Sequence, residues 1–407
     1  MVIIMNAYDQ KNECCGCMAC LNACPQKAIV MQTDSEGFFY PQTDERFCIN
    51  CGICKKVCPF QNGLPKNNEL IVFAAKHRDP EVLEASSSGG VFTAISDFIL
   101  KSGGVVYGVA FDENFNVCHQ RAQTLDQRDK FRGSKYVQSN LNETFDNIAR
   151  DLENGLIVLF SGTPCQCAGL RNYLAGIKYN RANLYLCDFI CHGVSSPLAW
   201  RDYVKFLEHK YQQRLVYFSF RNKENGWANS QQYARFAVQN SDESYNTKYS
   251  FLNLYRSLYI TRPSCFNCLF ASYNRIADIT LGDFWNIGNS KPHMDDDKGT
   301  SSVIISSQKG LYLFDAIKND LIWEQSNPAD CWQPHLEYPP VEPKGRGKFW
   351  DEYCKYGFDY VMQKYGKGTA SSRIIRTFTP LLKKAGLYRF AGKVYGKIFR
   401  RNAEAKG

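Results

Sequence analysis

The alternation of hydrophobic and polar positions divides most of the chain into short strand-like and helix-like segments. Apolar runs of strand length alternate with stretches in which apolar residues recur at helical spacing. The expected strands are 70–75, 105–111, 156–160, 184–190, 216–220 and 233–238, and the expected helices are 91–100, 141–152, 168–174 and 198–207. Because the last two strands read as antiparallel, the pattern predicts a mixed-sheet α/β domain and not a regular doubly wound sheet.

A separate hairpin is expected nearer the N-terminus. Residues 28–31 are apolar, 34–37 have turn composition and 38–41 are aromatic, which is the order of strand, turn and strand. The polar stretch 61–69 contains Gly and Pro and reads as a linker. The hairpin therefore belongs to a small domain that ends near residue 63.

Nine of the 18 cysteines lie in that small domain, and eight of them form two runs with the same spacing, Cys-x2-Cys-x2-Cys-x3-Cys-Pro. This spacing is typical of bacterial ferredoxins with two 4Fe–4S clusters, in which the fourth cysteine of each run binds the other cluster. Gly16 and Gly52 supply the backbone freedom that such tight loops need. One predicted ligand set is Cys14, Cys17, Cys20 and Cys58, and the other is Cys48, Cys51, Cys54 and Cys24.

A zinc site and a disulfide framework fit the two runs less well. Zinc sites normally use two separated cysteine pairs, and disulfides need an oxidising compartment, to which nothing in the sequence points. Cys15 is a ninth cysteine beside the first ligand and is able to replace Cys14, although the Pro-terminated spacing counts from Cys14.

Composition and charge narrow the class of protein. The 407 residues are 44% hydrophobic and 14% aromatic, as in a well-packed protein, and no run of about 18 apolar residues predicts a membrane-spanning helix. The N-terminal residues lack the basic region of a signal peptide, so a cytoplasmic location is expected. The net charge of +9 is uneven: residues 364–407 hold twelve Lys and Arg and one Glu, a net +11, which leaves −2 for residues 1–363.

The basic C-terminal segment predicts an arm over 351–407. Within 386–401, apolar residues at helical spacing face one side and Lys and Arg largely the other. A basic amphipathic helix of this kind favours contact with an acidic partner or with a membrane surface, which would be the inner face of the membrane. A helix docked on the protein's own acidic body and a disordered tail are the alternatives. No nucleic-acid recognition motif accompanies the basic residues, so nucleic acid is not an expected partner.

Six strings beyond residue 63 together resemble one family. They are SSSGGVFT (86–93), RGSKYVQS (132–139), FSGTPCQCAGL (160–170), DFICHGVSSP (188–197), RPSCFNCLF (262–270) and ADITLGDFW (277–285). The chain resembles the coenzyme F420 hydrogenase/dehydrogenase beta-subunit family, in the form with an N-terminal two-cluster ferredoxin domain. The resemblance implies a flavin-binding α/β domain over 64–350, FAD, a third iron–sulfur cluster, and a deazaflavin or another organic acceptor. Cys167 departs from the family, which usually has an aliphatic residue there.

Three loops are candidates for holding the flavin. The Ser- and Gly-rich loop before the helix at 91–100 offers amides and hydroxyls to a phosphate, although a plain helix cap has the same composition. The second loop, residues 133–136, combines small residues, a cation and an aromatic ring, and the alternative is that it is a surface turn. The third loop, residues 162–164, follows the expected strand 156–160, and loops after strands are the usual place for functional residues in α/β folds. The candidate residues are Ser88, Gly89, Gly90, Gly133, Ser134, Lys135, Tyr136, Gly162, Thr163 and Pro164.

The third cluster has four candidate ligands from three loops: Cys165, Cys191, Cys265 and Cys268. Zinc, to which the last two would be suited, and no metal at all are the alternatives, because isolated cysteines are usually small buried hydrophobes. Cys167 and Cys187 lie close enough in sequence to be confused with Cys165 and Cys191.

Two further features carry candidate chemistry. His192 follows Cys191 and is a candidate proton or hydrogen-bond donor near the flavin, although a lone histidine is more often structural. Arg221, Lys223 and Trp227 are candidates for an anionic-substrate or nicotinamide-like pocket, and a solvated strand end is the alternative.

These features predict an iron–sulfur flavoprotein oxidoreductase. Electrons would pass from a redox partner protein or reduced ferredoxin through the clusters to FAD and a small-molecule acceptor. An electron-transfer subunit without its own substrate, docked on a catalytic partner, is the alternative. A reductase of cell-surface polysaccharide biosynthesis is a weaker one, supported only by the basic arm.

Overall fold

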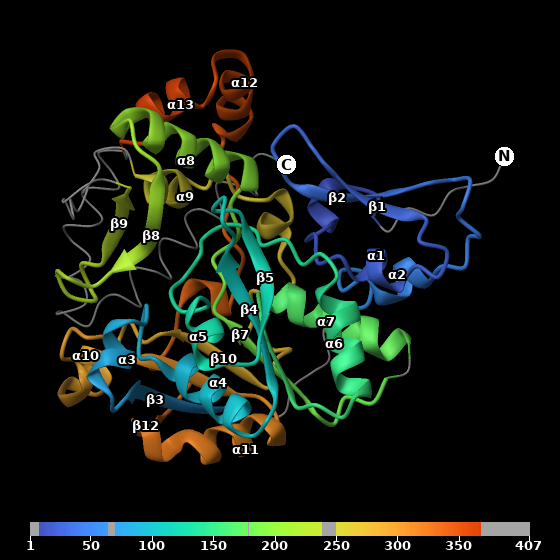
Figure 1. Cartoon of the computed structure of the whole chain (residues 1–407). Helices are drawn as coiled ribbons and strands as arrows, with labels where there is room; N and C mark the ends of the chain where they lie inside the picture. The colour runs from blue at the N-terminus through green and yellow to red at the C-terminus, as the bar shows by residue number, and fades with distance from the viewer. Residues whose placement is uncertain (1–7, 64–69, 178, 238–249, 368–407) are drawn as a thin grey trace.

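A computed structural model describes residues 8–63, 70–177, 179–237 and 250–367. It has three parts: a small N-terminal unit, a central sheet covered by helices, and an aromatic helical unit with a two-stranded ribbon (Figure 1). The mixed α/β fold with a large mixed sheet that the sequence predicts is confirmed.

The N-terminal unit consists of the predicted hairpin and two short helices. Strands β1 (Ile29–Thr33) and β2 (Phe39–Thr43) pair antiparallel, and helices α1 (Ala19–Ala23) and α2 (Ile53–Val57) lie beside each other. Gly16 and Gly52 have φ angles of +68° and +72°, which glycine adopts without steric cost. The expected role of these two glycines in the cysteine loops is therefore confirmed.

The central sheet has eight strands in the order β12-β3-β11-β10-β7-β6-β4-β5. Its middle strands β4, β6, β7 and β10 run parallel, and the strands outside them pair antiparallel. The strands are β3 (Ile71–His77), β4 (Val105–Phe111), β5 (Val117–Ala122), β6 (Val158–Ser161), β7 (Leu184–Phe189), β10 (Ile279–Asp283), β11 (Ser301–Ile305) and β12 (Leu321–Ser326).

Helices cover both faces of this sheet because alternate strand residues point to opposite sides. Val106 belongs to the core under α4 (Val91–Lys101) and α11 (Gln308–Ile317), whereas its neighbours Val105 and Tyr107 belong to the core under α6 (Thr144–Glu153) and α7 (Pro164–Gly176). The second core also contains Cys17, Met18 and Val57 of the N-terminal unit. The N-terminal unit and the central domain thus share one hydrophobic core.

Helix α7 begins four residues before the predicted segment. The Thr163 hydroxyl accepts a hydrogen bond from the Gln166 amide, Gln166 Oε1 accepts one from the Thr163 amide, and Pro164 occupies the first turn. This capping box, with proline as the first helical residue, makes α7 begin at Pro164, ahead of the apolar segment. The helix terminus therefore lies inside the predicted functional loop 162–164.

The third part is built around aromatic side chains. Strands β8 (Leu215–Asn222) and β9 (Gln231–Phe236) pair antiparallel as predicted. Trp200, Phe218, Phe220 and Phe251 pack in the core of this part. The helices around it are α8 (Pro197–Tyr211), α9 (Phe251–Ser257), α12 (Arg346–Tyr356) and α13 (Phe358–Tyr365).

The remaining helices are short connections. The α-helical ones are α3 (Pro80–Glu84), α5 (Leu125–Asp129) and α10 (Ile287–Ser290). The 3-10 helices are η1 (Lys11–Glu13), η2 (Pro263–Asn267), η3 (Pro292–Met294), η4 (Lys318–Asp320) and η5 (Pro334–Leu336).

The predicted C-terminal arm is described only at its beginning. Phe358, Val361 and Met362 are buried in the aromatic core, so residues 351–365 pack against the body. The amphipathic stretch 386–401 lies outside the described residues. Among the helices that the structure describes, none combines the length and the apolar character needed to cross a bilayer.

Candidate functional site

Two separate cavities in the N-terminal unit are each lined by four of the predicted ligand cysteines. Cys14, Cys17, Cys20 and Cys58 line one, which we call the inner cavity. Cys24, Cys48, Cys51 and Cys54 line the other, the outer cavity. The grouping is the one that the spacing predicts, with the fourth cysteine of each run beside the other run. The donor set at each cavity, four thiols, fits a 4Fe–4S cluster.

The two cavities differ in their distance from the central domain. Cys17 of the inner cavity packs against α7, where a Cβ atom on Gly169 would stand 2.7 Å from the Cys17 Sγ atom. At the outer cavity, Cys51 is exposed, and the neighbouring side chains of Phe47 and Ile49 are 58% and 61% exposed. The outer cavity therefore faces solvent and the inner cavity faces the body.

A third cavity is lined by Cys165, Cys191, Cys265 and Cys268, together with Cys15. Cys165 stands in the first turn of α7, Cys191 follows β7, Cys265 lies in η2, and Cys268 ends that 3-10 helix. Four thiols from three loops again fit the donor chemistry of a 4Fe–4S cluster. Burial raises the pKa of the Cys265 thiol to about 12 and that of Cys268 to about 11, so thiolates at this place need a bound positive charge.

The two cysteines that resemble these ligands lie elsewhere. Cys167 is fully buried in the core under α6 and α7, and Cys187 is buried in the core under α4 and α11. The thiols at the third site surround a cavity and do not converge on one point: within the described ranges, no three Cys, His, Asp or Glu side chains are placed to hold a single ion.

A larger cavity of about 290 Å³ opens at the carboxyl ends of the parallel strands β6 and β7. Gly90, at φ +76°, precedes the first turn of α4 and lines the cavity with Ser88. The Ser134 amide donates to the Ser87 hydroxyl at 2.8 Å and joins the first two predicted loops. Of the predicted flavin residues, those lining the cavity are Ser88, Gly90, Gly133, Ser134, Lys135, Tyr136 and Thr163.

Three predicted flavin residues do not line this cavity. The Gly89 amide donates to Ser301 Oγ at 3.0 Å, so that Gly89 joins the loop to β11. The Gly162 amide donates to the Cys187 carbonyl at 3.2 Å. Pro164 lines the third cysteine cavity instead. Gly89 and Gly162 therefore tie their loops to neighbouring strands and do not face the cavity.

Two buried polar atoms of the large cavity's lining residues have no hydrogen-bond partner within the described part of the chain. They are Oδ2 of Asp188 and Nη2 of Arg221. Buried polar atoms are nearly always paired, so an unpaired one next to a cavity marks a place that a further polar group would satisfy. Asp188 and Arg221 thus bring an acidic group and a cation to the lining of a cavity that also contains Ser88 and Gly90 of the loop before α4, which fits a polar ring system with an anionic tail.

Arg221 is held in place by an ion pair. Its Nη1 atom lies 2.5 Å from Asp283 Oδ2, and its Nε atom donates to Ser230 Oγ at 3.2 Å. Trp227 and Lys223 do not line the cavity: the Trp227 ring stacks on Trp285 with centroids 4.7 Å apart, and the Lys223 ammonium donates to the Lys298 carbonyl. Of the three residues predicted for an anion pocket, Arg221 alone lines this cavity.

His192 lines the large cavity, and its ring lies 4.4 Å from the ring of His335, centroid to centroid. Burial lowers the pKa of His192 to about 4 and that of His335 to about 3. A neutral imidazole at this position is able to donate one hydrogen bond and accept another.

Sequence reasoning did not assign two features of the site. Cys15 lines both the inner and the third cavity, and only its position beside Cys14 drew attention to it. The buried ion pair between Arg275 Nη2 and Asp188 Oδ1, at 2.9 Å, links the loop after Cys268 to strand β7. Single polar residues in apolar segments, such as Asp188 after LYLC, were the available signal.

Comparison with known proteins follows the same division of the chain. Residues 13–62 match a 4Fe-4S dicluster domain. Residues 72–145 match the N-terminal part, and residues 156–330 the C-terminal part, of the family described as coenzyme F420 hydrogenase/dehydrogenase, beta subunit. The two parts together cover more than half of the chain.

Two curated relatives match the N-terminal unit alone. The pyruvate synthase subunit PorD of Thermotoga maritima is 36% identical over 59 residues, and an uncharacterised ferredoxin of Methanocaldococcus jannaschii is 33% identical over 49 residues. These matches cover 14% and 12% of this chain, and 54% and 62% of the relatives. The chain thus spans little more than half the length of the curated relatives that it matches.

Among solved structures, a chain of the F420-reducing NiFe hydrogenase complex from Methanosarcina barkeri is similar to this protein. Its TM-score is 0.45 and its identity 17%, over 74% of this chain and 92% of that one. The family matches over residues 72–330, preceded by the dicluster match, agree with the predicted resemblance. The chain therefore belongs to the coenzyme F420 hydrogenase/dehydrogenase beta-subunit family and carries an N-terminal 4Fe–4S ferredoxin-type domain.

Proposed function

We propose that the protein is an iron–sulfur flavoprotein that passes electrons from two ferredoxin-type clusters through a third cluster to FAD and an organic acceptor. The observation that carries the proposal is that the inner, third and large cavities share walls. Cys15 lines both the inner and the third cavity, and Thr163, Gly193 and Val194 line both the third and the large cavity. When bound, the clusters would supply single-electron transfer and FAD the exchange between single electrons and a hydride.

The residues of the chain have distinct tasks in this scheme. The thiols of the three cysteine cavities hold the clusters, and the first turn of α4 with Ser88 and Ser134 binds the flavin phosphates. Arg221 orients an anionic part of the acceptor or flavin, because it lines the cavity and its guanidinium is fixed by Asp283. The acceptor remains a deazaflavin or another small molecule.

Metal and flavin analysis of the anaerobically purified protein tests this function. About twelve irons, as many sulfides and one FAD per chain are expected from three cubanes and one flavin. Brown protein without flavin would contradict the flavoprotein and leave an electron relay. Zinc in place of iron at the third site would contradict the row of clusters.

The alternative, an electron-transfer subunit without its own substrate, is favoured by the exposed edge at the outer cavity. Phe47 and Ile49 flank Cys48 and are mostly exposed, as at a docking surface for a redox protein. Reduction of a small molecule by the isolated protein with reduced ferredoxin or dithionite supports the enzyme. Electron transfer only to a co-purified protein supports the subunit.

Flavin binding is expected to depend on pH through Lys135. The Lys135 ammonium donates to the carbonyls of Lys130 and Arg132, and burial lowers its pKa to about 7. Below pH 7 a flavin phosphate meets a charged ammonium. Above it the free protein must first take up a proton, so affinity falls as pH rises through 7, by up to tenfold per unit.

Fluorescence titration of the flavin-depleted protein with FAD between pH 6 and 8.5 measures this dependence. Lys135→Arg keeps its charge across that range and is expected to bind FAD with little change. An equally steep loss of affinity in Lys135→Arg would contradict the role of Lys135.

A further inference from the structure

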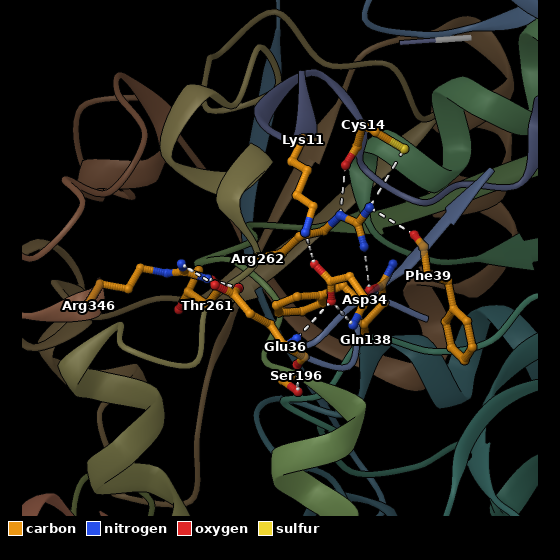
Figure 2. A network of polar contacts seen from close by, with 11 residues as sticks. Lys11, Cys14, Asp34, Glu36, Phe39, Gln138, Ser196, Thr261, Arg262 and Arg346 are labelled. Atoms are coloured by element: carbon orange, nitrogen blue, oxygen red, sulfur yellow. Dashed lines mark hydrogen bonds and ion pairs between the residues drawn. The ribbon is translucent and has the colours of Figure 1, made fainter. Parts of the chain in front are cut away.

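We propose that Arg262 raises the reduction potential of the inner cluster above that of the outer one and so directs electrons toward the third site. Arg262 is fully buried, at 0% exposure, and precedes helix η2. Its Nε atom donates to the Cys14 carbonyl at 2.7 Å, and its Nη2 atom lies 3.6 Å from the Cys14 Sγ atom. Figure 2 shows the guanidinium reaching from the central domain to the cysteine loop.

The remaining contacts of Arg262 hold it in one orientation. Nη2 also donates to the Phe39 carbonyl at 3.0 Å, and Nη1 donates to Gln138 Oε1 at 2.9 Å. The guanidinium lies 4.3 Å from the centroid of the Tyr40 ring. A Cβ on Gly16 would collide with the Gln138 side-chain amide and stand 3.1 Å from Arg262 Nη1. Glycine at this position therefore lets the side chains of Gln138 and Arg262 approach the cysteine loop.

Among the described residues, the charge of Arg262 has no carboxylate partner. Four arginines are buried in the described part of the chain, and the other three, Arg128, Arg275 and Arg346, form ion pairs with Asp or Glu. A buried cation without a counter-charge is costly. The ionisable side chains that act on the Arg262 charge are Cys14, Tyr40, Cys15 and Cys265, and of these Cys14 and Cys265 are predicted cluster ligands. A thiolate-bound cluster is an anion and supplies the missing counter-charge.

This position has a direct consequence for electron transfer. When the inner cluster takes one electron, no bond forms or breaks, and its negative charge grows by one beside a fixed cation that donates toward a ligand sulfur. Charge and hydrogen bonds to the sulfurs set cluster potentials. Within the described ranges the outer cavity has no such cation: the basic side chains on α2, Lys55 and Lys56, are not buried. Arg262 lines the third cavity and contacts Cys14 of the inner one, and Cys15 lines both, so the favoured cluster is the one next to the onward site.

The test is a redox titration of the cluster-loaded full-length protein, followed by electron paramagnetic resonance. In Arg262→Met the potential of one ferredoxin-type cluster is expected to fall, and that of the other to stay. When the protein holds one electron, the ratio of outer-cluster to inner-cluster reduction is expected to rise tenfold or more. A tenfold change corresponds to a difference in potential of about 59 mV for a one-electron couple. Arg262→Lys, which keeps the charge without the forked geometry, is expected to shift less.

Arg346→Met is the matched control. Arg346 is buried at the same junction, where Nη1 donates to Glu36 Oε1 at 2.8 Å and Nη2 to the Thr261 carbonyl, and none of its hydrogen bonds or ion pairs within the described residues reaches a cysteine (Figure 2). Arg346→Met is expected to weaken the contact between the N-terminal unit and the rest of the protein and to leave the potentials of both ferredoxin-type clusters unchanged. Equal shifts in Arg262→Met and Arg346→Met, or no shift with iron intact, would overturn the proposal. Loss of the inner cluster's iron in both Arg262 variants would also overturn it, because Arg262 would then be needed for assembly.

The inference rests on the proposed electron route for its direction only. The shift in potential needs the two ferredoxin-type clusters and neither FAD nor an acceptor. Protein without flavin or third cluster that still shows the shift would separate the failure of the proposed function from that of Arg262.

Discussion

Cys268→Ala is expected to lose about four of about twelve irons per chain and all electron transfer from the ferredoxin-type clusters to the flavin. Cys268 lines the third cavity with Cys165, Cys191 and Cys265, and its removal leaves a cubane with three of its four predicted thiolates. Iron and sulfide analysis with rapid-mixing flavin absorbance measures both losses.

Cys331→Ala is the control for this variant. Cys331 is a buried thiol, its Sγ atom lies 3.6 Å from the Pro328 carbonyl, and it lines none of the four cavities. It is expected to keep its iron and its electron transfer. Full iron content in Cys268→Ala would contradict a cluster at the third site, and equal loss in both variants would indicate general damage.

Arg275→Met is expected to lower the free energy of unfolding by about 3–5 kcal/mol, because it leaves the Asp188 carboxylate buried without its cation. The two side chains are 1% and 0% exposed. Arg275 also donates to the carbonyls of Phe270 and Ser272, and so holds the loop after Cys268 against the sheet. Urea unfolding followed by tryptophan fluorescence measures the change.

Two further variants separate the charge effect from general damage. Lys318→Met removes an exposed pair with Asp315 and is expected to cost less than about 1 kcal/mol. The double variant Arg275→Met/Asp188→Leu removes both buried charges and is expected to recover most of the lost stability. If the double variant is no more stable than Arg275→Met, the ion pair is not the cause.

The local pattern was sufficient for the elements with strong periodicity. The strand at 105–111 and the helix at 91–100 stand within a residue of their predicted ends. Strands β10, β11 and β12 were not predicted, because segments such as Ser301–Ile305 are short and begin with polar residues. Their strand conformation comes from pairing with β3 and β7 across the sheet, which is a tertiary effect.

The sequence alone determined the grouping of eight cysteines into two sets, because a fixed spacing on one short loop brings three thiols to one place whatever the rest of the chain does. It also indicated the family and the four thiols of the third cavity. Only the tertiary structure decided that Cys15 lines both the inner and the third cavity, that Arg262 of the third cavity contacts Cys14 of the inner one, and that Arg221, but not Trp227, lines the large one. Cys15 and Arg262 lie far apart along the chain, and they meet because the N-terminal unit packs on the central domain through one shared hydrophobic core.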